Sequence, residues 1–144
     1  MQKRVSIYDA APDAYKALMG LENYVRHAGI DHKMLDLIKI RASQVNGCAY
    51  CINMHTIDAR KAGETEQRIY ALNAWRETPY FTDAERALLA FTEAVTLIAH
   101  HIPDDVYTEM TKHFSELQTA NIVMAIATIN AWNRVGIATN LMPA

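Results

Sequence analysis

Cysteine is scarce in this sequence, and this scarcity limits the kinds of site that the chain can build. Of its 144 residues only Cys48 and Cys51 are cysteines, so neither a disulfide framework nor a four-cysteine metal centre can form. A domain of this length buries enough apolar surface to fold without such staples. We therefore expect a single domain over residues 1–144, in which the two cysteines are free for chemistry.

Excess charge of one sign and long apolar runs are also lacking. The chain has 14 Lys and Arg against 16 Asp and Glu, and neither sign is clustered. A nucleic-acid partner needs a basic surface, so none is expected. The longest apolar run, residues 122–127, is far short of a membrane span, and no apolar signal region follows the first residues. These absences predict a cytoplasmic protein that binds no membrane.

Helix signals occur throughout the chain, and the strand-like alternation of polar and apolar residues is nearly absent. The pattern predicts an all-α fold of about six to seven helices. The first is expected over residues 12–29 and the second over residues 32–44. Asn46-Gly47 should end the second helix, after which a helix with the cysteines runs to Gly63. A short helix is expected after Thr65.

The second half of the chain contains two sequences that resemble capping boxes. Thr82-Asp83-Ala84-Glu85 should begin an amphipathic helix that stops near His100. Pro103 should open a short helix, and Ser115-Glu116-Leu117-Gln118 should begin the last one.

The last helix differs from the others because it has almost no charge. From Leu117 to Ala144 the only charged side chain is Arg134. A helix that is apolar or neutral all round must be buried, either at the centre of the subunit or in a subunit interface. Burying a whole helix inside so small a domain is difficult, so the pattern favours a homo-oligomer.

The segment from Asn46 to His55 has the strongest chemical pattern, because it places two thiols and an imidazole on one helical face. The cysteines are three residues apart, and His55 follows Cys51 by four. One interpretation is that the cysteines are small buried apolar residues. Another is a zinc site with His55 as third ligand and one of His100 and His101 as fourth. A third is a redox pair, because α-carbons about 5 to 6 Å apart permit a disulfide.

The redox interpretation requires a thiolate, since a free thiol with a pKa of about 8.5 is mostly protonated at neutral pH. A helix N-terminus would favour the anion at Cys48, whereas His55 would favour it at Cys51. The two effects point to different nucleophiles, and the residues alone leave that choice open.

One segment of the chain resembles the core of a known family. It is Asp36-Leu37-Ile38-Lys39-Ile40-Arg41-Ala42-Ser43-Gln44-Val45-Asn46-Gly47-Cys48-Ala49-Tyr50-Cys51, continued by His55 and Gly63. It is similar to the AhpD-like alkylhydroperoxidase branch of the carboxymuconolactone decarboxylase family, and residues 125–134 resemble that group's closing helix. The resemblance implies an all-α subunit, a trimeric or hexameric oligomer, and thiol-dependent reduction of hydroperoxides.

Matched residue by residue, the resemblance implies that Cys51 attacks the peroxide, Cys48 resolves the product to a disulfide, and His55 relays protons. The relay carboxylate, usually glutamate, falls on Asp36, whose shorter side chain would need a bridging water. A simpler interpretation of Asp36 is an exposed ion pair with Lys33 or Lys39.

No flavin or nicotinamide motif is present, so no bound cofactor is expected. The disulfide would instead be reduced by an external dithiol on a thioredoxin-like or lipoyl-bearing protein. Three rival functions use the same residues differently or not at all: a thiol-based sensor or exchange protein without turnover, a carboxymuconolactone decarboxylase-like lyase that does not need the cysteines, and an oligomeric binding protein with a relic site.

Overall fold

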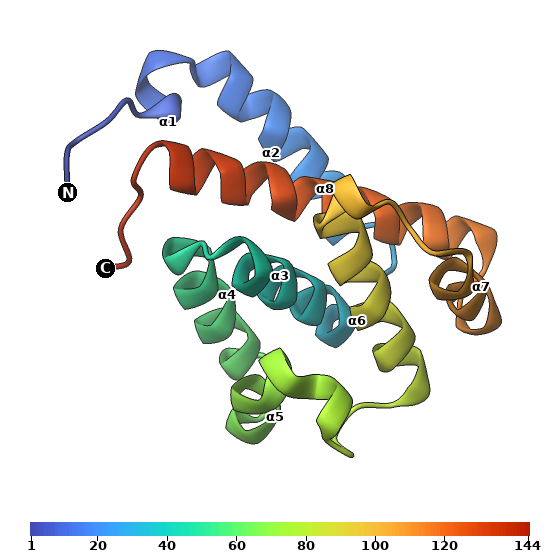
Figure 1. Ribbon diagram of the computed structural model, residues 1–144. Helices are drawn as coiled ribbons and strands as arrows, with labels where there is room; N and C mark the ends of the chain where they lie inside the picture. Colours follow the sequence, from blue (N-terminus) through green and yellow to red (C-terminus); the bar gives the residue numbers. More distant parts are fainter.

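The computed structural model describes residues 1–144 and is entirely helical, which confirms the predicted fold class (Figure 1). Eight α-helices and two short 3-10 helices follow one another along the chain. They are α1 (Ile7–Ala10), α2 (Pro12–Arg26), α3 (His32–Asn46), α4 (Ala49–Lys61), α5 (Glu66–Ala71), η1 (Leu72–Glu77), α6 (Asp83–Thr96), η2 (Ile98–His100), α7 (Asp104–His113) and α8 (Glu116–Ala138).

Helix α8 lies at the centre of the arrangement, with α2 along one side and α3, α4 and α6 on the other (Figure 1). Its start is fixed by the predicted capping box, in which the Ser115 hydroxyl accepts from the Gln118 amide and the Gln118 side chain accepts from the Ser115 amide. The central position buries one side of this helix, including Ile122, Ile126 and Ile129, and accounts for the lack of charge on that side. None of the helices combines the length and the apolar character needed to cross a membrane.

Helix α3 is buried on two sides and joins two apolar clusters. Ile38 packs with Leu88 of α6 and Ile126 of α8 in the larger cluster. Leu37 and Ile40 belong to the smaller cluster, which α4, η1 and α6 complete. All five side chains are fully buried, and each contributes roughly 1.5–3 kcal/mol by leaving water. This packing fixes α3, and therefore the turn that leads from it to the cysteines.

Several helix boundaries differ from the sequence prediction: α3 ends at Asn46 rather than at residue 44, and α4 ends at Lys61 rather than at Gly63. Helix α2 ends at Arg26 rather than Gly29, and Gly29 adopts a φ of 84° in the following turn. Helix α6 ends at Thr96, and a separate 3-10 turn continues to His100. The single turn α1, which the sequence did not predict, precedes α2 and brings the number of α-helices to eight.

Candidate functional site

The turn between α3 and α4 places Cys48 at the start of a helix. Gly47 has a φ of 72°, a conformation that glycine adopts without steric cost, and it ends α3 as the Asn46-Gly47 pair predicts. The Cys48 amide then donates to the Ser43 carbonyl at 3.0 Å, which closes the turn. Cys48 is thereby the N-cap of α4, and its Sγ accepts from the Cys51 amide at 3.3 Å.

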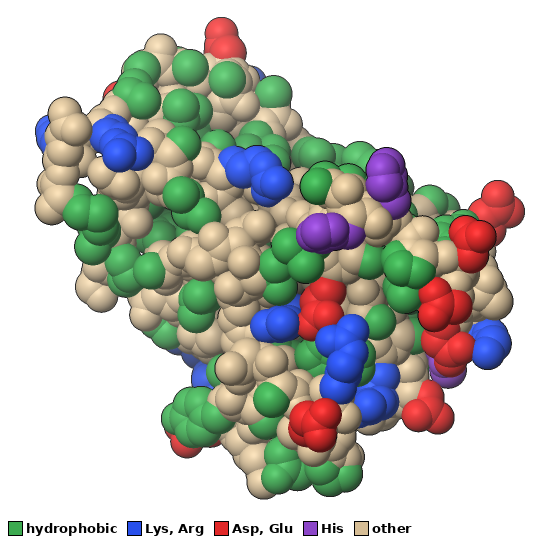
Figure 2. Space-filling view, viewed as in Figure 1, with side chains coloured by type: hydrophobic (Ala, Val, Ile, Leu, Met, Phe, Trp, Pro, Cys, Tyr) green, Lys and Arg blue, Asp and Glu red, His purple; other side chains and the backbone are tan.

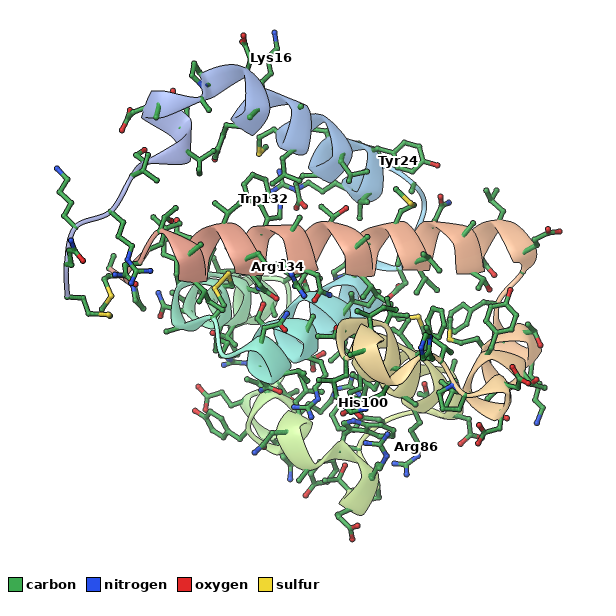
Figure 3. All side chains as sticks on the ribbon, turned by 45° about the horizontal axis from the view of Figure 1, so that its top comes forward. Lys16, Tyr24, Arg86, His100, Trp132 and Arg134 are labelled. Carbon is green, nitrogen blue, oxygen red and sulfur yellow. A yellow bond between two sulfur atoms is a disulfide. The ribbon has the colours of Figure 1, made fainter.

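Cys48 and Cys51 form a disulfide, with α-carbons 5.3 Å apart. This confirms that the pair can close across one turn, as their spacing predicts. Both residues are buried, at 2% and 3% exposure. The disulfide lies against the C-terminal half of α8, where an added Cβ on Gly136 would come within 3.1 Å of Cys48 Sγ and 3.6 Å of Cys51 Sγ (Figure 3).

Of the two cysteines, Cys51 alone lines the pocket beside the disulfide. A pocket of about 260 Å³ lies between α2, α4 and α8, and its lining includes Cys51 and His55 but not Cys48. Most of the remaining lining is apolar or aromatic, including Tyr15, Met54 and Trp132. Trp132 fills part of the space between α2 and α8 (Figure 3). A small molecule in this pocket would therefore meet Cys51 first.

His55 is held in the neutral state of a proton acceptor. Its side chain is buried, and its Nε2 atom is enclosed without a hydrogen-bond partner. Burial, assisted by the positive charge of Lys39, lowers the pKa of His55 to about 4, although Glu22 and Asp58 act in the opposite direction. A neutral imidazole one turn beyond Cys51 is suited to accept the thiol proton.

A buried carboxylate from α2, which the sequence analysis missed, lines the same pocket. Glu22 accepts hydrogen bonds from Lys39 Nζ at 2.9 Å, Arg26 Nε at 3.0 Å and Trp132 Nε1 at 3.3 Å. Burial favours its neutral form, but Lys39, Arg26 and Trp132 outweigh this effect and lower the pKa of Glu22. It is therefore an anion at neutral pH. Its only signal in the sequence is the spacing of four residues to Arg26, which is common on any helix.

Asp36 lies apart from this pocket. Its carboxylate forms no ion pair or hydrogen bond within the chain, and Asp36 does not contribute to the lining. The alternative of an exposed ion pair with Lys39 is wrong, because Lys39 is buried and pairs with Glu22. Asp36 is half-buried, and desolvation raises the pKa of its carboxyl. Its expected role as the relay carboxylate stays a prediction.

The remaining histidines do not join the dithiol. His100 and His101 lie at the end of η2, a part of the chain that forms none of the pocket. No group of three or more His, Cys, Asp and Glu side chains is arranged to hold a metal ion.

Comparison with known proteins relates the chain to one family. Residues 12–94 match the model of the carboxymuconolactone decarboxylase family, and this range includes Glu22 as well as the dithiol segment. The uncharacterized protein YdfG of Bacillus subtilis strain 168 is 48% identical over 139 residues, which cover 96% of this chain and 95% of YdfG.

Solved structures agree with this relationship. The crystal structure of ATU0492 from Agrobacterium tumefaciens, a protein of unknown function and candidate antioxidant defence protein AhpD, is 42% identical. It covers 99% of both chains with a TM-score of 0.97. An AhpD-core, peroxidase-related protein from Ralstonia eutropha JMP134 has a TM-score of 0.83 at 18% identity over 95% of this chain and 74% of its own, and it shows the fold alone.

The apo debrominase Bmp8 also shares the fold, with a TM-score of 0.84 at 24% identity over 92% of this chain and 72% of its own. The family match includes the dithiol segment, and the similarity to YdfG extends over nearly the whole chain. Both agree with the all-helical architecture. The chain therefore belongs to the carboxymuconolactone decarboxylase family and has the AhpD-like fold.

Proposed function

We propose that this protein is a thiol-dependent hydroperoxide reductase, in which Cys51 attacks the peroxide and Cys48 resolves the product. The observation that supports this order is that Cys51 lines the pocket together with His55, whereas Cys48 is enclosed against Gly136. Access to substrate therefore favours Cys51 as the nucleophile. The N-cap position of Cys48 suits a sulfur that must leave as a thiolate when the disulfide is reduced.

The proposed cycle begins when His55 accepts the proton of the Cys51 thiol. The thiolate attacks the terminal oxygen of the hydroperoxide, so that an S–O bond forms, the O–O bond breaks, and the alkoxide takes the proton from the imidazolium and leaves as an alcohol. Cys51 is then a sulfenic acid. Cys48 attacks its sulfur, the disulfide forms, and water is released. The peroxide gains two electrons, and the two thiols lose them.

An external dithiol must return those electrons and two protons. We propose a thioredoxin-like or lipoyl-bearing protein as the donor. Because Cys51 is reached through a small pocket and is only 3% exposed, a slender dithiol arm is favoured over a flat protein surface.

The direct test uses the fully reduced protein and one equivalent of cumene hydroperoxide. We expect both thiols to disappear together and the intact mass to fall by two hydrogens. With excess dithiothreitol, many equivalents of peroxide should be consumed per subunit. Survival of both thiols after exposure to the peroxide would exclude the proposed function and leave a cysteine-independent activity, such as that of a family lyase.

A redox sensor or disulfide-exchange protein without turnover is a second candidate, and the burial of both sulfurs favours it. A reductant that cannot reach the disulfide would make oxidation slow to reverse. The two functions differ in the turnover assay, because a sensor oxidises once and then stops.

We also propose that the protein is a homo-oligomer, trimeric or hexameric, which uses the outer face of α8. Although α8 is central, it keeps exposed apolar side chains along one side, including Val123 at 36%, Met124 at 39% and Ile137 at 46% exposure. On the face of the molecule in Figure 2, most acidic side chains gather at the lower right, and hydrophobic and uncharged atoms cover much of the left part. Exposed apolar side chains along one side of a helix are typical of an interface, and Arg134 is the one charged residue among them.

Replacing Met124 with glutamate should therefore dissociate the oligomer. Burying an unpaired carboxylate in an interface costs several kcal/mol, enough to move micromolar protein to the monomer. Sedimentation velocity measures the change. Tyr70→Glu, which adds the same charge at an exposed aromatic residue of α5, is the matched control and should leave the assembly intact. A wild-type protein that sediments as a monomer would contradict the proposal.

A further inference from the structure

The buried carboxylate of Glu22 has no part in the cycle proposed above, although it lines the same pocket as the reacting groups. Glu22 is only 3% exposed and lines the pocket with Cys51 and His55. It reaches this position from α2, a helix outside the dithiol segment. A buried charge is costly, so its place beside a reactive dithiol needs an explanation.

The partners of Glu22 leave one of its oxygens with spare capacity. Oε1 accepts from both Lys39 and Arg26, at 2.9 and 3.0 Å. Oε2 accepts only from Trp132 Nε1, at the longer distance of 3.3 Å. A carboxylate oxygen has two lone pairs, so Oε2 can accept a further hydrogen bond. Lys39 and Trp132 hold the group in place without saturating it.

His55 has an unsatisfied polar atom that matches the spare capacity of Glu22 Oε2, because its enclosed Nε2 has no hydrogen-bond partner. The largest charge effects on this imidazole come from Lys39 of α3, Glu22 and Arg26 of α2, and Asp58 of α4. The nearest part of α8 contributes the neutral Trp132. Of the two acids, Asp58 is exposed, and Glu22 alone is buried in the pocket lining. Asp36 is not among these groups.

We infer that Glu22, rather than Asp36, is the positioning carboxylate of this site, and that it stabilises the His55 imidazolium formed when Cys51 loses its proton. The inference rests on the proposed function for its place in the cycle. The Cys51 proton moves to His55, and Glu22 stays ionised throughout and accepts a hydrogen bond from the imidazolium directly or through one water. Burial and the charge of Lys39 keep the imidazole neutral at rest, and Glu22 lowers the free-energy cost of protonating it.

The test measures how readily Cys51 ionises, without any peroxide. In a Cys48→Ser background, which keeps a favoured N-cap residue, iodoacetamide alkylates Cys51 alone. We expect Glu22→Gln, which retains one amide oxygen in the place of Oε1 for Lys39 and Arg26 but removes the charge, to slow alkylation at pH 7 by about tenfold or more. Glu22→Asp keeps the charge but withdraws it by one methylene. Its alkylation rate should fall between those of the unmodified protein and Glu22→Gln. Asp36→Asn should react at the unmodified rate.

The dependence on pH separates this role from simple damage to the pocket. At a pH high enough for the wild-type rate to reach its plateau, Cys51 is ionised without help from His55, so all variants should converge on one rate. A distorted pocket would be slow at every pH. Equal or faster alkylation of Glu22→Gln at pH 7 would overturn the inference, since loss of a nearby negative charge alone favours the thiolate. Slow alkylation in Asp36→Asn instead of Glu22→Gln would overturn it in favour of Asp36.

Thermal unfolding monitored by circular dichroism shows whether Glu22→Gln folds. If it does not, Glu22→Asp replaces it in the test, and an unmodified alkylation rate in Glu22→Asp overturns the inference. Failure of the proposed function is a separate result. It would appear as a wild-type protein whose thiols survive cumene hydroperoxide, whatever the alkylation rates.

Discussion

Replacing Cys51 with serine is expected to reduce peroxide turnover to the uncatalysed background, a loss of roughly three orders of magnitude or more. The serine hydroxyl is a poor nucleophile toward peroxide, and the pocket offers no second thiol, because Cys48 is not part of its lining. The measurement is consumption of cumene hydroperoxide with excess dithiothreitol, compared with the wild-type protein at equal concentration.

The matched variant is Cys48→Ser, which should also fail to turn over but for a different reason. Its Cys51 should still react once with peroxide and gain one oxygen atom as a sulfenic acid, visible by intact mass and by trapping with dimedone. Cys51→Ser should show no such adduct. If the adduct formed on Cys48 in the Cys51→Ser variant at the wild-type rate, the assigned order of the two cysteines would be reversed.

Acidification should destabilise the oxidised protein well before the carboxylates titrate, because His55 resists protonation in the folded state. Its pKa is lowered to about 4, whereas an unfolded histidine has a pKa of about 6.5. The unfolded chain therefore binds a proton first as the pH falls. This contribution to stability is fully present above pH 6.5 or so and is lost toward the folded pKa. We expect a loss of about 2 kcal/mol between pH 7 and pH 5 from this residue.

Urea unfolding at the two pH values measures the loss, and His55→Gln should largely remove it. His100→Gln changes the same residue type on the surface and should leave the difference as it is. Glu22 and Glu93, whose pKa values are lowered by their cationic partners, lose their stabilising charge only at more acid pH. A wild-type protein with equal stability at both pH values would contradict the buried, neutral state of His55.

Helix starts could be predicted from the sequence because their determinants are local. The Thr82 hydroxyl and the Glu85 carboxylate form the expected capping box, and α6 begins where it predicts. Helix ends were less predictable. Leu97, with a ψ of 50°, interrupts α6 before His100, and no sequence signal marks this residue. The single turn α1 is stopped by Pro12, because the residue before a proline avoids helical geometry.

The same contrast between locally determined features and features set by packing applies to the candidate site. The dithiol, its turn and His55 lie within one short segment, so their spacing was enough to predict that they meet. Glu22 and Trp132 approach them only because α2 packs on α8 and α8 packs on α4. Nothing in the local sequence around either residue marks it as part of a site. The simple interpretation of Lys39 as a partner of Asp36 failed for the same reason, since its partner comes from another helix.

Gly136 has a consequence for anyone who would transplant this dithiol into another helical scaffold. A glycine inside a helix costs roughly 0.5–1 kcal/mol relative to alanine, so α8 gives up some stability there. In return its bare backbone leaves room for Cys48 Sγ, which a methyl group would meet at 3.1 Å. A recipient scaffold would have to supply a second helix with a side-chain-free position opposite the capping cysteine. Copying only the ten residues from Asn46 to His55 would transfer the reactive groups but not the space that the disulfide needs.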